Sequence, residues 1–173
     1  HADPARREQA QRWCSLLTPV LKAACTDQAF HGASDCLQVF GGHGYVREWG
    51  IEQIVRDSRV AMIYEGTNEI QSIDLLVRKV LADGGRSLAA LWGDLHADLL
   101  REGLPANAWE DMTRRRNEVT RRLAEVAGVQ PELPYWVAGD FLRATALTML
   151  TWAWLRIDAA AASAPEPARW QRA

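Results

Sequence analysis

Glycine and proline divide this sequence into segments whose apolar residues recur at helical spacing. Between residues 18 and 40 the interior breaker is Gly32, and one face carries Ala29, Ala33, Cys36, Leu37 and Phe40. Thr18-Pro19 predicts the start of this helix, because a hydroxyl can cap it and proline suits its first position. Gly41-Gly42 predicts its end. No stretch alternates with the period of two that a half-buried strand needs, so the sequence predicts an all-α fold.

The same punctuation predicts further helices along the chain. One covers residues 51–60, and the next begins at Thr67 with apolar positions Ile70, Ile73, Val77, Val80 and Leu81. Gly84-Gly85 is the clearest boundary, so we expect two units, residues 1–83 and an incomplete helical extension, residues 84–173. The extension contains three helical patterns, near residues 88–102, 107–127 and 135–162. Asn107 with Glu110 predicts a capping box at the second of them.

Composition restricts the classes of function. An apolar content of 48% in 173 residues is enough for a packed core, and it argues against global disorder. The net charge of −2 gives no electrostatic footprint for nucleic acid. The basic cluster alternates with Glu118 and Glu125 at helical spacing, which predicts a solvated, salt-bridged face. That cluster consists of Arg114, Arg115, Arg116, Arg121 and Arg122.

Cysteines and apolar runs predict ordinary packing. Cys14, Cys25 and Cys36 contain no CxxC pair, so we interpret them as small buried hydrophobes in a reducing, cytoplasmic protein and expect no metal site. Residues 144–155 form the most apolar run, which is too short to span a bilayer and predicts a buried helix. We expect the same packing role for Trp92, Trp109, Trp136, Trp152 and Trp154.

Two motifs follow one another within residues 38–71. The first reads Gln-Val-Phe-Gly-Gly-His-Gly-Tyr from Gln38, and the second reads Arg-Asp-Ser-Arg-Val-Ala-Met-Ile-Tyr-Glu-Gly-Thr-Asn-Glu-Ile-Gln from Arg56. In the order of these motifs and in the amphipathic helix after them, residues 18–81 resemble the C-terminal four-helix-bundle domain of acyl-CoA dehydrogenases. The extension resembles that of the longer bacterial members of this family.

The resemblance implies a flavin-dependent α,β-desaturation of an acyl-CoA. In the family, the glutamate of the Tyr-Glu-Gly-Thr turn removes the α-proton, and this residue is Glu65 here. FAD takes the β-hydrogen as hydride. The backbone N–H of Glu65 would polarise the thioester carbonyl. Tyr64 and Gly66 are expected to face the substrate, since glycine allows close approach to the backbone. The alternative for an isolated glutamate is a solvated turn residue.

The resemblance also implies two groups of cofactor contacts. Thr67, Asn68 and Glu69 stand at a helix start, where free N–H groups favour polar cofactor atoms. Gln38, Gly41 and Gly42 match a segment that contacts FAD bound mainly by a neighbouring subunit, so we expect a homodimer or a dimer of dimers. The residue types alone also allow a purely structural role: Gly41-Gly42 suits a helix C-cap, and Thr67 suits an N-cap. Either cap role is compatible with cofactor contact.

Family members depend on domains that precede this region, so we expect the remainder of a parent polypeptide as a partner and expect the 173-residue chain alone to be inactive. An electron-transfer acceptor would reoxidise the flavin. Two alternatives stay open: an acyl-CoA oxidase of the same fold, and a non-enzymatic, DNA-associated relative of the family. The second would favour a basic surface, which the net charge disfavours.

Overall fold

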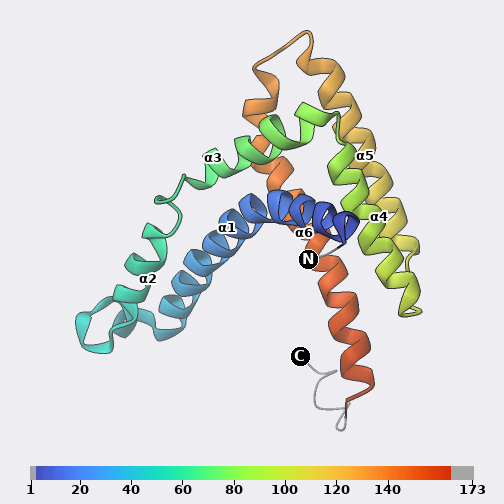
Figure 1. Ribbon diagram of the computed structural model, residues 1–173. Coiled ribbons are helices and arrows are strands. Elements are labelled where there is room, and N and C mark those ends of the chain that lie inside the picture. Colours follow the sequence, from blue (N-terminus) through green and yellow to red (C-terminus); the bar gives the residue numbers. More distant parts are fainter. Residues whose placement is uncertain (1–2, 165–173) are drawn as a thin grey trace.

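The computed structural model describes residues 3–164, and among these residues it contains helices and turns but no strand (Figure 1). The all-α prediction is therefore confirmed. The α-helices are α1 (Pro4–Phe40), α2 (Ile51–Val60), α3 (Asn68–Ile73), α4 (Arg86–Arg101), α5 (Asn107–Ala127) and α6 (Leu133–Ala162). Short 3-10 turns are η1 (Gly41–Tyr45), η2 (Arg47–Trp49) and η4 (Leu81–Asp83), and η3 (Asp74–Val80) is a π-helical segment.

The first helix begins earlier than the sequence predicts. Asp3 caps α1 by accepting a hydrogen bond from the N–H of Ala5. The predicted start at Thr18 is wrong, because the Thr18 hydroxyl donates back to the Cys14 carbonyl at 2.7 Å inside an unbroken helix. Pro19 lies on the buried face of that helix.

Pro19 leaves one carbonyl of α1 without its helical donor. Proline has no N–H, so the carbonyl of Ser15, four residues earlier, cannot be satisfied within the helix. The Lys79 ammonium of η3 donates to this carbonyl at 2.7 Å and also pairs with Asp74 at 2.6 Å. A side chain from another helix thus takes over the missing bond and joins α1 to η3.

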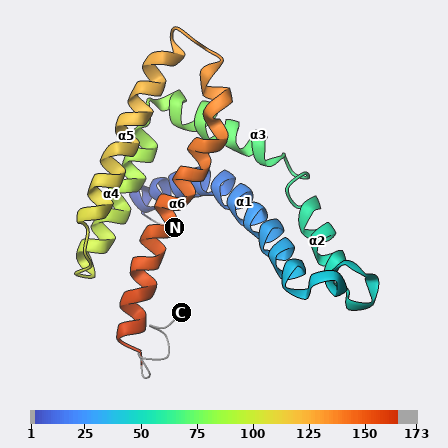
Figure 2. The ribbon, with the colours of Figure 1, turned by 180° about the vertical axis from the view of Figure 1, so that it is seen from behind.

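The core lies where the N-terminal half of α1 meets η3, α4 and α6. Both views show α4 and α5 side by side and α6 crossing α1 (Figures 1 and 2). One cluster of buried residues includes Leu16, Leu75, Trp92, Trp109 and Phe141. It spans both sides of Gly84-Gly85, so the predicted units share a core, and the boundary between residues 83 and 84 stays a prediction.

Residues 24–67, which we call the arm, contrast with this core. The arm comprises the C-terminal part of α1, η1, η2, α2 and the turn before α3. Its buried residues are Ala33 and Gly44. Of the predicted α1 stripe, Ala29, Cys36 and Phe40 are exposed. Large apolar side chains are exposed along the arm at Val39, Phe40, Tyr45, Val46, Trp49, Ile54, Val60, Ile63 and Tyr64.

The helix predicted after Thr67 is present, but its buried face differs from the prediction. Val80 is fully buried as predicted, but Ile70 is exposed, and Leu75, which was not predicted, is fully buried. Leu75 and Val80 are five apart, a spacing that brings side chains onto one face in a π-helical turn. The predicted period of 3.6 could not anticipate this change in η3.

Two predictions about burial are wrong in part. All three cysteines are exposed and unpaired rather than buried, because they follow the outer face of the continuous α1. Trp92 and Trp109 pack in the core as expected, with ring centroids 5.9 Å apart. Trp136 and Trp154 are exposed instead, because α6 buries only one of its faces.

Polar contacts connect the helices of the extension. Asp98 of α4 accepts hydrogen bonds from Trp152 and Arg156 of α6, at 3.1 Å and 2.7 Å. The Trp13 indole of α1 donates to Asp94 at 3.0 Å. The capping box at Asn107 is not formed, because the N-cap of α5 is Ala106 and no side chain caps it.

Four arginines of the predicted cluster pair with Asp111, Glu118 or Glu125. Arg116 differs, because it turns inward to donate to the Phe141 carbonyl at 3.1 Å and to Thr145 at 3.2 Å. Burial lowers the pKa of this guanidinium. Arg116 therefore joins α5 to α6 instead of extending the solvated face.

Candidate active site

The Tyr64–Thr67 segment forms a tight turn between α2 and α3. The Tyr64 N–H donates to the Val60 carbonyl at 3.3 Å, and the Asn68 N–H donates across the turn to the Met62 carbonyl at 3.2 Å. Gly66 has φ +83°, and a Cβ there would lie 3.1 Å from the Gln71 amide nitrogen. The backbone conformation thus favours glycine, and a Cβ would also require the Gln71 side chain to shift slightly.

Glu65 has an unusual backbone. Its φ is +56°, and among residues 3–164 no other non-glycine residue has a positive φ. The left-handed conformation costs about 1–2 kcal/mol for a residue with a Cβ. Strain of this kind concentrates at active sites, where the surrounding structure maintains it. The strained residue coincides with the glutamate that the sequence predicts as the base.

The polar groups of Glu65 are accessible. Its side chain is exposed, and its backbone N–H donates to no acceptor within the described residues. Its carbonyl, in contrast, accepts a hydrogen bond from the Gln71 side chain at 3.0 Å. The turn therefore presents one carboxylate and one free N–H donor from the same residue.

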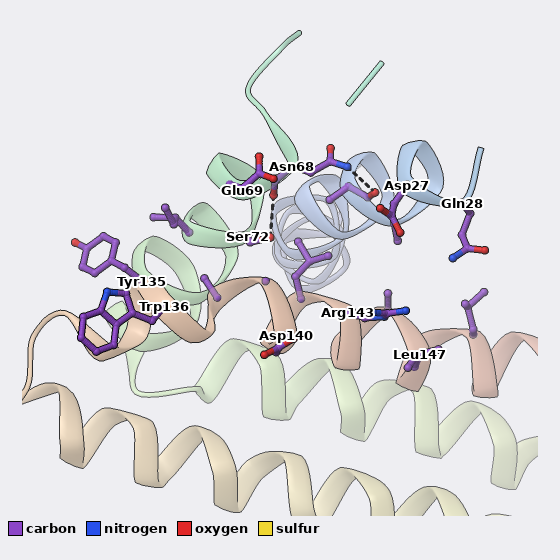
Figure 3. Close-up of a pocket in the computed structure, with 18 residues that line it drawn as sticks. Asp27, Gln28, Asn68, Glu69, Ser72, Tyr135, Trp136, Asp140, Arg143 and Leu147 are labelled. Carbon is purple, nitrogen blue, oxygen red and sulfur yellow. Dashed lines mark hydrogen bonds between the residues drawn. The ribbon is translucent and has the colours of Figure 1, made fainter. Parts of the chain in front are cut away.

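A lysine of α1 holds the next carbonyl of the turn. The Lys22 ammonium donates to the Gly66 carbonyl at 2.8 Å and to the Asn68 side-chain oxygen at 2.9 Å. The Asn68 side-chain oxygen also accepts from the Thr26 hydroxyl at 3.1 Å. The Asn68 amide nitrogen donates to the Ala23 carbonyl at 3.2 Å (Figure 3). Sequence reasoning missed Lys22, because a lysine in a helix gives no sign of a partner 44 residues away.

Thr67, Asn68 and Glu69 form the first turn of α3. The Thr67 hydroxyl accepts from the Ile70 N–H at 3.3 Å, so its alternative role as an N-cap is confirmed. The Asn68 side chain contacts α1, and its backbone N–H donates to the Met62 carbonyl. The pKa of Glu69 is lowered, chiefly by a hydrogen bond from its own backbone N–H and then by the Thr67 hydroxyl. Glu69 therefore adds a carboxylate beside the turn.

The first motif lies at the opposite end of α2 from the Glu65 turn (Figure 1). Gly41 has φ +58° and caps α1, as the alternative reading expected. A Cβ added at Gly41 or Gly42 would meet nothing within 4 Å, and the Gln38 side chain is exposed. The ten residues of α2, about 15 Å at 1.5 Å per residue, lie between the first motif and the Glu65 turn. One chain thus does not bring both groups of predicted cofactor residues together.

A groove of about 500 Å³ lies between α1, α3 and α6. Figure 3 shows Asn68 and Glu69 of α3 and Asp27 of α1 on one side, facing Trp136 and Arg143 of α6. Glu65, Tyr64 and Gly66 do not line the groove. The apolar residues of α6 could have indicated this groove from the sequence. They were instead assigned to the core, because the sequence predicted a buried helix there.

Other ionisable groups have structural partners. His96, for which the sequence showed no partner, lies with its Nε2 3.0 Å from a carboxylate oxygen of Glu110 in α5. His31 lies 3.7 Å from Asp27 within α1. No group of three or more potential metal ligands occurs within residues 3–164. Nor does any helix in this part of the chain combine the length and apolarity needed to cross a membrane.

The sequence is similar to known proteins over its N-terminal part and beyond. The family model for "Acyl-CoA dehydrogenase, C-terminal domain" matches residues 3–81. Over 87 residues, half of this chain, the sequence is 46% identical to 3-methylmercaptopropionyl-CoA dehydrogenase of Ruegeria pomeroyi, covering 15% of that protein. It is 38% identical over 80 residues, 46% of this chain, to the broad-specificity linear acyl-CoA dehydrogenase FadE5 of Mycobacterium tuberculosis, covering 13% of it.

A third relative extends the similarity. The chain is 29% identical over 129 residues, 75% of its length, to the mouse mitochondrial very long-chain specific acyl-CoA dehydrogenase, and covers 20% of that protein. This alignment is longer than the 83 residues that precede Gly84, so it continues into the helices of the extension. The chain spans at most a fifth of the length of these three relatives.

Proposed function

Because this chain belongs, through residues 3–81, to the acyl-CoA dehydrogenase family, we propose that it is the C-terminal part of a flavin-dependent enzyme. The proposed reaction is the α,β-desaturation of an acyl-CoA thioester. The observation that supports this most directly is Glu65, whose exposed side chain extends from a left-handed backbone position that the turn maintains.

In the proposed mechanism Glu65 acts as the base. Its carboxylate takes the proton from the α-carbon, and the electrons of that C–H bond form the α,β double bond as the β-hydrogen leaves with its electron pair. Bound FAD would accept this hydride. The free N–H of Glu65 would donate to the thioester oxygen and stabilise the negative charge that develops there. Tyr64, which is 51% exposed, and Gly66 would lie against the substrate.

The residues proposed to hold FAD have surfaces that allow close approach. Gly41 and Gly42 offer open backbone on the arm, and Gln38 is exposed beside them. Since α2 separates this motif from Glu65, we propose that it serves a second copy of the enzyme in a homodimer or dimer of dimers. Thr67, Asn68 and Glu69 would contact FAD held by their own subunit.

The exposed apolar residues of the arm suit a surface that other parts of the enzyme cover. We therefore propose that the 173-residue chain is inactive alone and needs the remainder of its polypeptide. An electron-transfer acceptor would reoxidise the flavin. Three free, exposed thiols suit a cytoplasmic enzyme.

Glu65→Gln in the full-length enzyme tests the proposal. Glutamine keeps the size and hydrogen-bonding capacity of the side chain but cannot take a proton. We expect normal flavin content and a kcat lower by about 10²–10⁴-fold, as for the loss of a general base. Glu132→Gln, an exposed carboxylate at the start of α6, is the matched control and should retain full activity. Undiminished turnover of Glu65→Gln would remove Glu65 from the mechanism.

A further inference from the structure

Lys22 connects the Glu65 turn to α1. Its ammonium donates to the Gly66 carbonyl and to the Asn68 amide oxygen, and it is partly buried. The Thr26 hydroxyl donates to the same oxygen of Asn68. A charged donor makes a hydrogen bond roughly twice as strong as a neutral one. Lys22 and Thr26 therefore anchor both sides of Thr67 to a long, continuous helix.

These contacts restrain a backbone that would otherwise relax. Glycine explores left-handed and right-handed conformations about equally, so Gly66 alone cannot fix its peptide planes. Glu65 occupies a left-handed conformation that its Cβ disfavours. The Gln71 side chain fixes the Glu65 carbonyl from within the same segment. Lys22 fixes the Gly66 carbonyl from α1, which determines where the turn lies relative to the rest of the fold.

We propose that Lys22 is a positioning residue for Glu65. By holding the Gly66 carbonyl, Lys22 keeps the Glu65 carboxylate and N–H in the orientation that the reaction requires. The proposal rests on the proposed function of Glu65 and adds a second, non-reacting residue to it. Lys22 itself does not touch the substrate in this role.

Lys79 provides a matched control. Like Lys22, it donates through its ammonium to a backbone carbonyl, in this case that of Ser15 in α1, at 2.7 Å. It also has a second polar partner, Asp74. Its contacts join α1 to η3 and do not involve the turn. Loss of Lys79 should therefore weaken the fold through the same kind of bond without moving Glu65.

The experiment compares Lys22→Met and Lys79→Met in the full-length flavoenzyme. Methionine keeps an unbranched apolar stem and removes the charge and the donors. For Lys22→Met we expect kcat per bound flavin to fall by about 100-fold, because small misplacements of reacting groups cost this much. KM should stay within about threefold, because uniform binding is unaffected. For Lys79→Met we expect a lower melting temperature and unchanged kcat.

A second readout does not depend on turnover. Hydrogen–deuterium exchange of the peptide that covers residues 61–70 should accelerate in Lys22→Met and not in Lys79→Met, because only the former frees the turn. Thr26→Val, which removes the weaker contact to Asn68, should change kcat and exchange in the same direction by a smaller factor. Activity is expressed per bound flavin, so partial loss of folded enzyme does not obscure the comparison.

The outcomes separate this inference from the proposed function. If Glu65→Gln is inactive while Lys22→Met and Thr26→Val match Lys79→Met in kcat per flavin, Glu65 is the base and the positioning role is overturned. If Glu65→Gln is fully active, the proposed function fails whatever Lys22 does. A Lys22→Met enzyme with raised KM and normal kcat would also overturn the positioning role, because it would assign Lys22 to binding.

Discussion

The arm and the core differ in how they use apolar residues. The core buries Leu75, Leu76 and Val80 completely where η3 meets α1, α4 and α6. The arm buries only Ala33 and Gly44 and exposes most of its large apolar side chains. Both sequence motifs lie in the arm or at its junction with α3. The part of the chain that carries the proposed chemistry is thus the part that stabilises itself least.

This difference indicates that stabilising residues and proposed functional residues lie in different parts of the chain. Residues that stabilise the fold lie largely in the N-terminal half of α1 and after residue 71. The arm supplies groups for contact with substrate, cofactor or another surface, and it depends on the core for its position. Functional segments with few buried contacts are expected to have low local stability. The Lys22 and Asn68 contacts are where the Glu65 turn is tied to the core side of the molecule.

The largest effect should come from removing a core tryptophan. Trp92 is 2% exposed and packs against Trp109. Trp92→Ala should lower the free energy of unfolding by about 3–5 kcal/mol, from lost burial and the cavity left behind. The matched change in the arm is Trp49→Ala. Trp49 is 55% exposed, and its ring packs edge-on against Phe40 and His43.

For Trp49→Ala we expect a loss below about 1 kcal/mol, since little surface is buried. Denaturant unfolding of the 173-residue chain, followed by circular dichroism, gives both values. Equal losses for the two tryptophans would show that the arm folds as part of the core and would break the comparison.

An intermediate effect is expected at Asp98. Asp98→Ala would leave the Trp152 and Arg156 donors of α6 without their acceptor, at a cost of about 1–3 kcal/mol. Asp111→Ala is the control, because its pairs with Arg114 and Arg115 lie on the exposed face of α5. That change should cost about 0.5 kcal/mol or less. The same unfolding measurement applies, and a larger loss for Asp111 would contradict the assignment of stability to contacts between helices.

The smallest effect concerns Glu118 on the solvated face of α5. Hydrogen bonds from Arg121 and then Arg122 lower its pKa to about 2, from 4.5 for an isolated group. A carboxyl with a lowered pKa in the folded state contributes stability that is complete above pH 4.5 and is lost as the pH falls toward 2. An NMR titration of the Glu118 carboxyl measures this.

Arg121→Gln should raise the Glu118 pKa more than Arg122→Gln, because Arg121 is the larger cause of the lowering. This order of effects would show that the ion pairs of α5 contribute to stability from an exposed face outside the arm, which sharpens the comparison between the arm and the rest of the fold. A wild-type titration with a midpoint near 4.5 would instead mean that these pairs are not maintained in solution.

The sequence predicted the helices and the site motif better than the contacts between them. Tyr64 to Glu69 are consecutive, so their grouping followed from a local pattern. The helix boundaries at Phe40 and Val60 also followed from local signals. Cofactor contact by Gln38, Gly41 and Gly42 stays a prediction, because it concerns a second copy of the chain.

Errors arose where a distant residue changed the local preference. Pro19 predicts a helix start by itself, but Lys79 satisfies the carbonyl that it frees, and α1 continues through it. The burial of Leu75 was missed because η3 is π-helical, and the predicted stripe assumed α-helical spacing. Lys22 could not be recognised because its partners, Gly66 and Asn68, are brought to it by the fold.

Pro19 also gives α1 a feature that an uninterrupted helix lacks. In the middle of an ordinary helix every carbonyl already accepts a hydrogen bond, so the backbone offers a neighbouring helix no position that differs from the others. The Ser15 carbonyl lacks its helical donor, and the Lys79 ammonium donates a hydrogen bond to it. Sliding η3 along α1 by one turn, about 5.4 Å, would lose that hydrogen bond. The proline thus specifies the register in which the two helices pair, a role that a buried polar side chain fills in coiled coils.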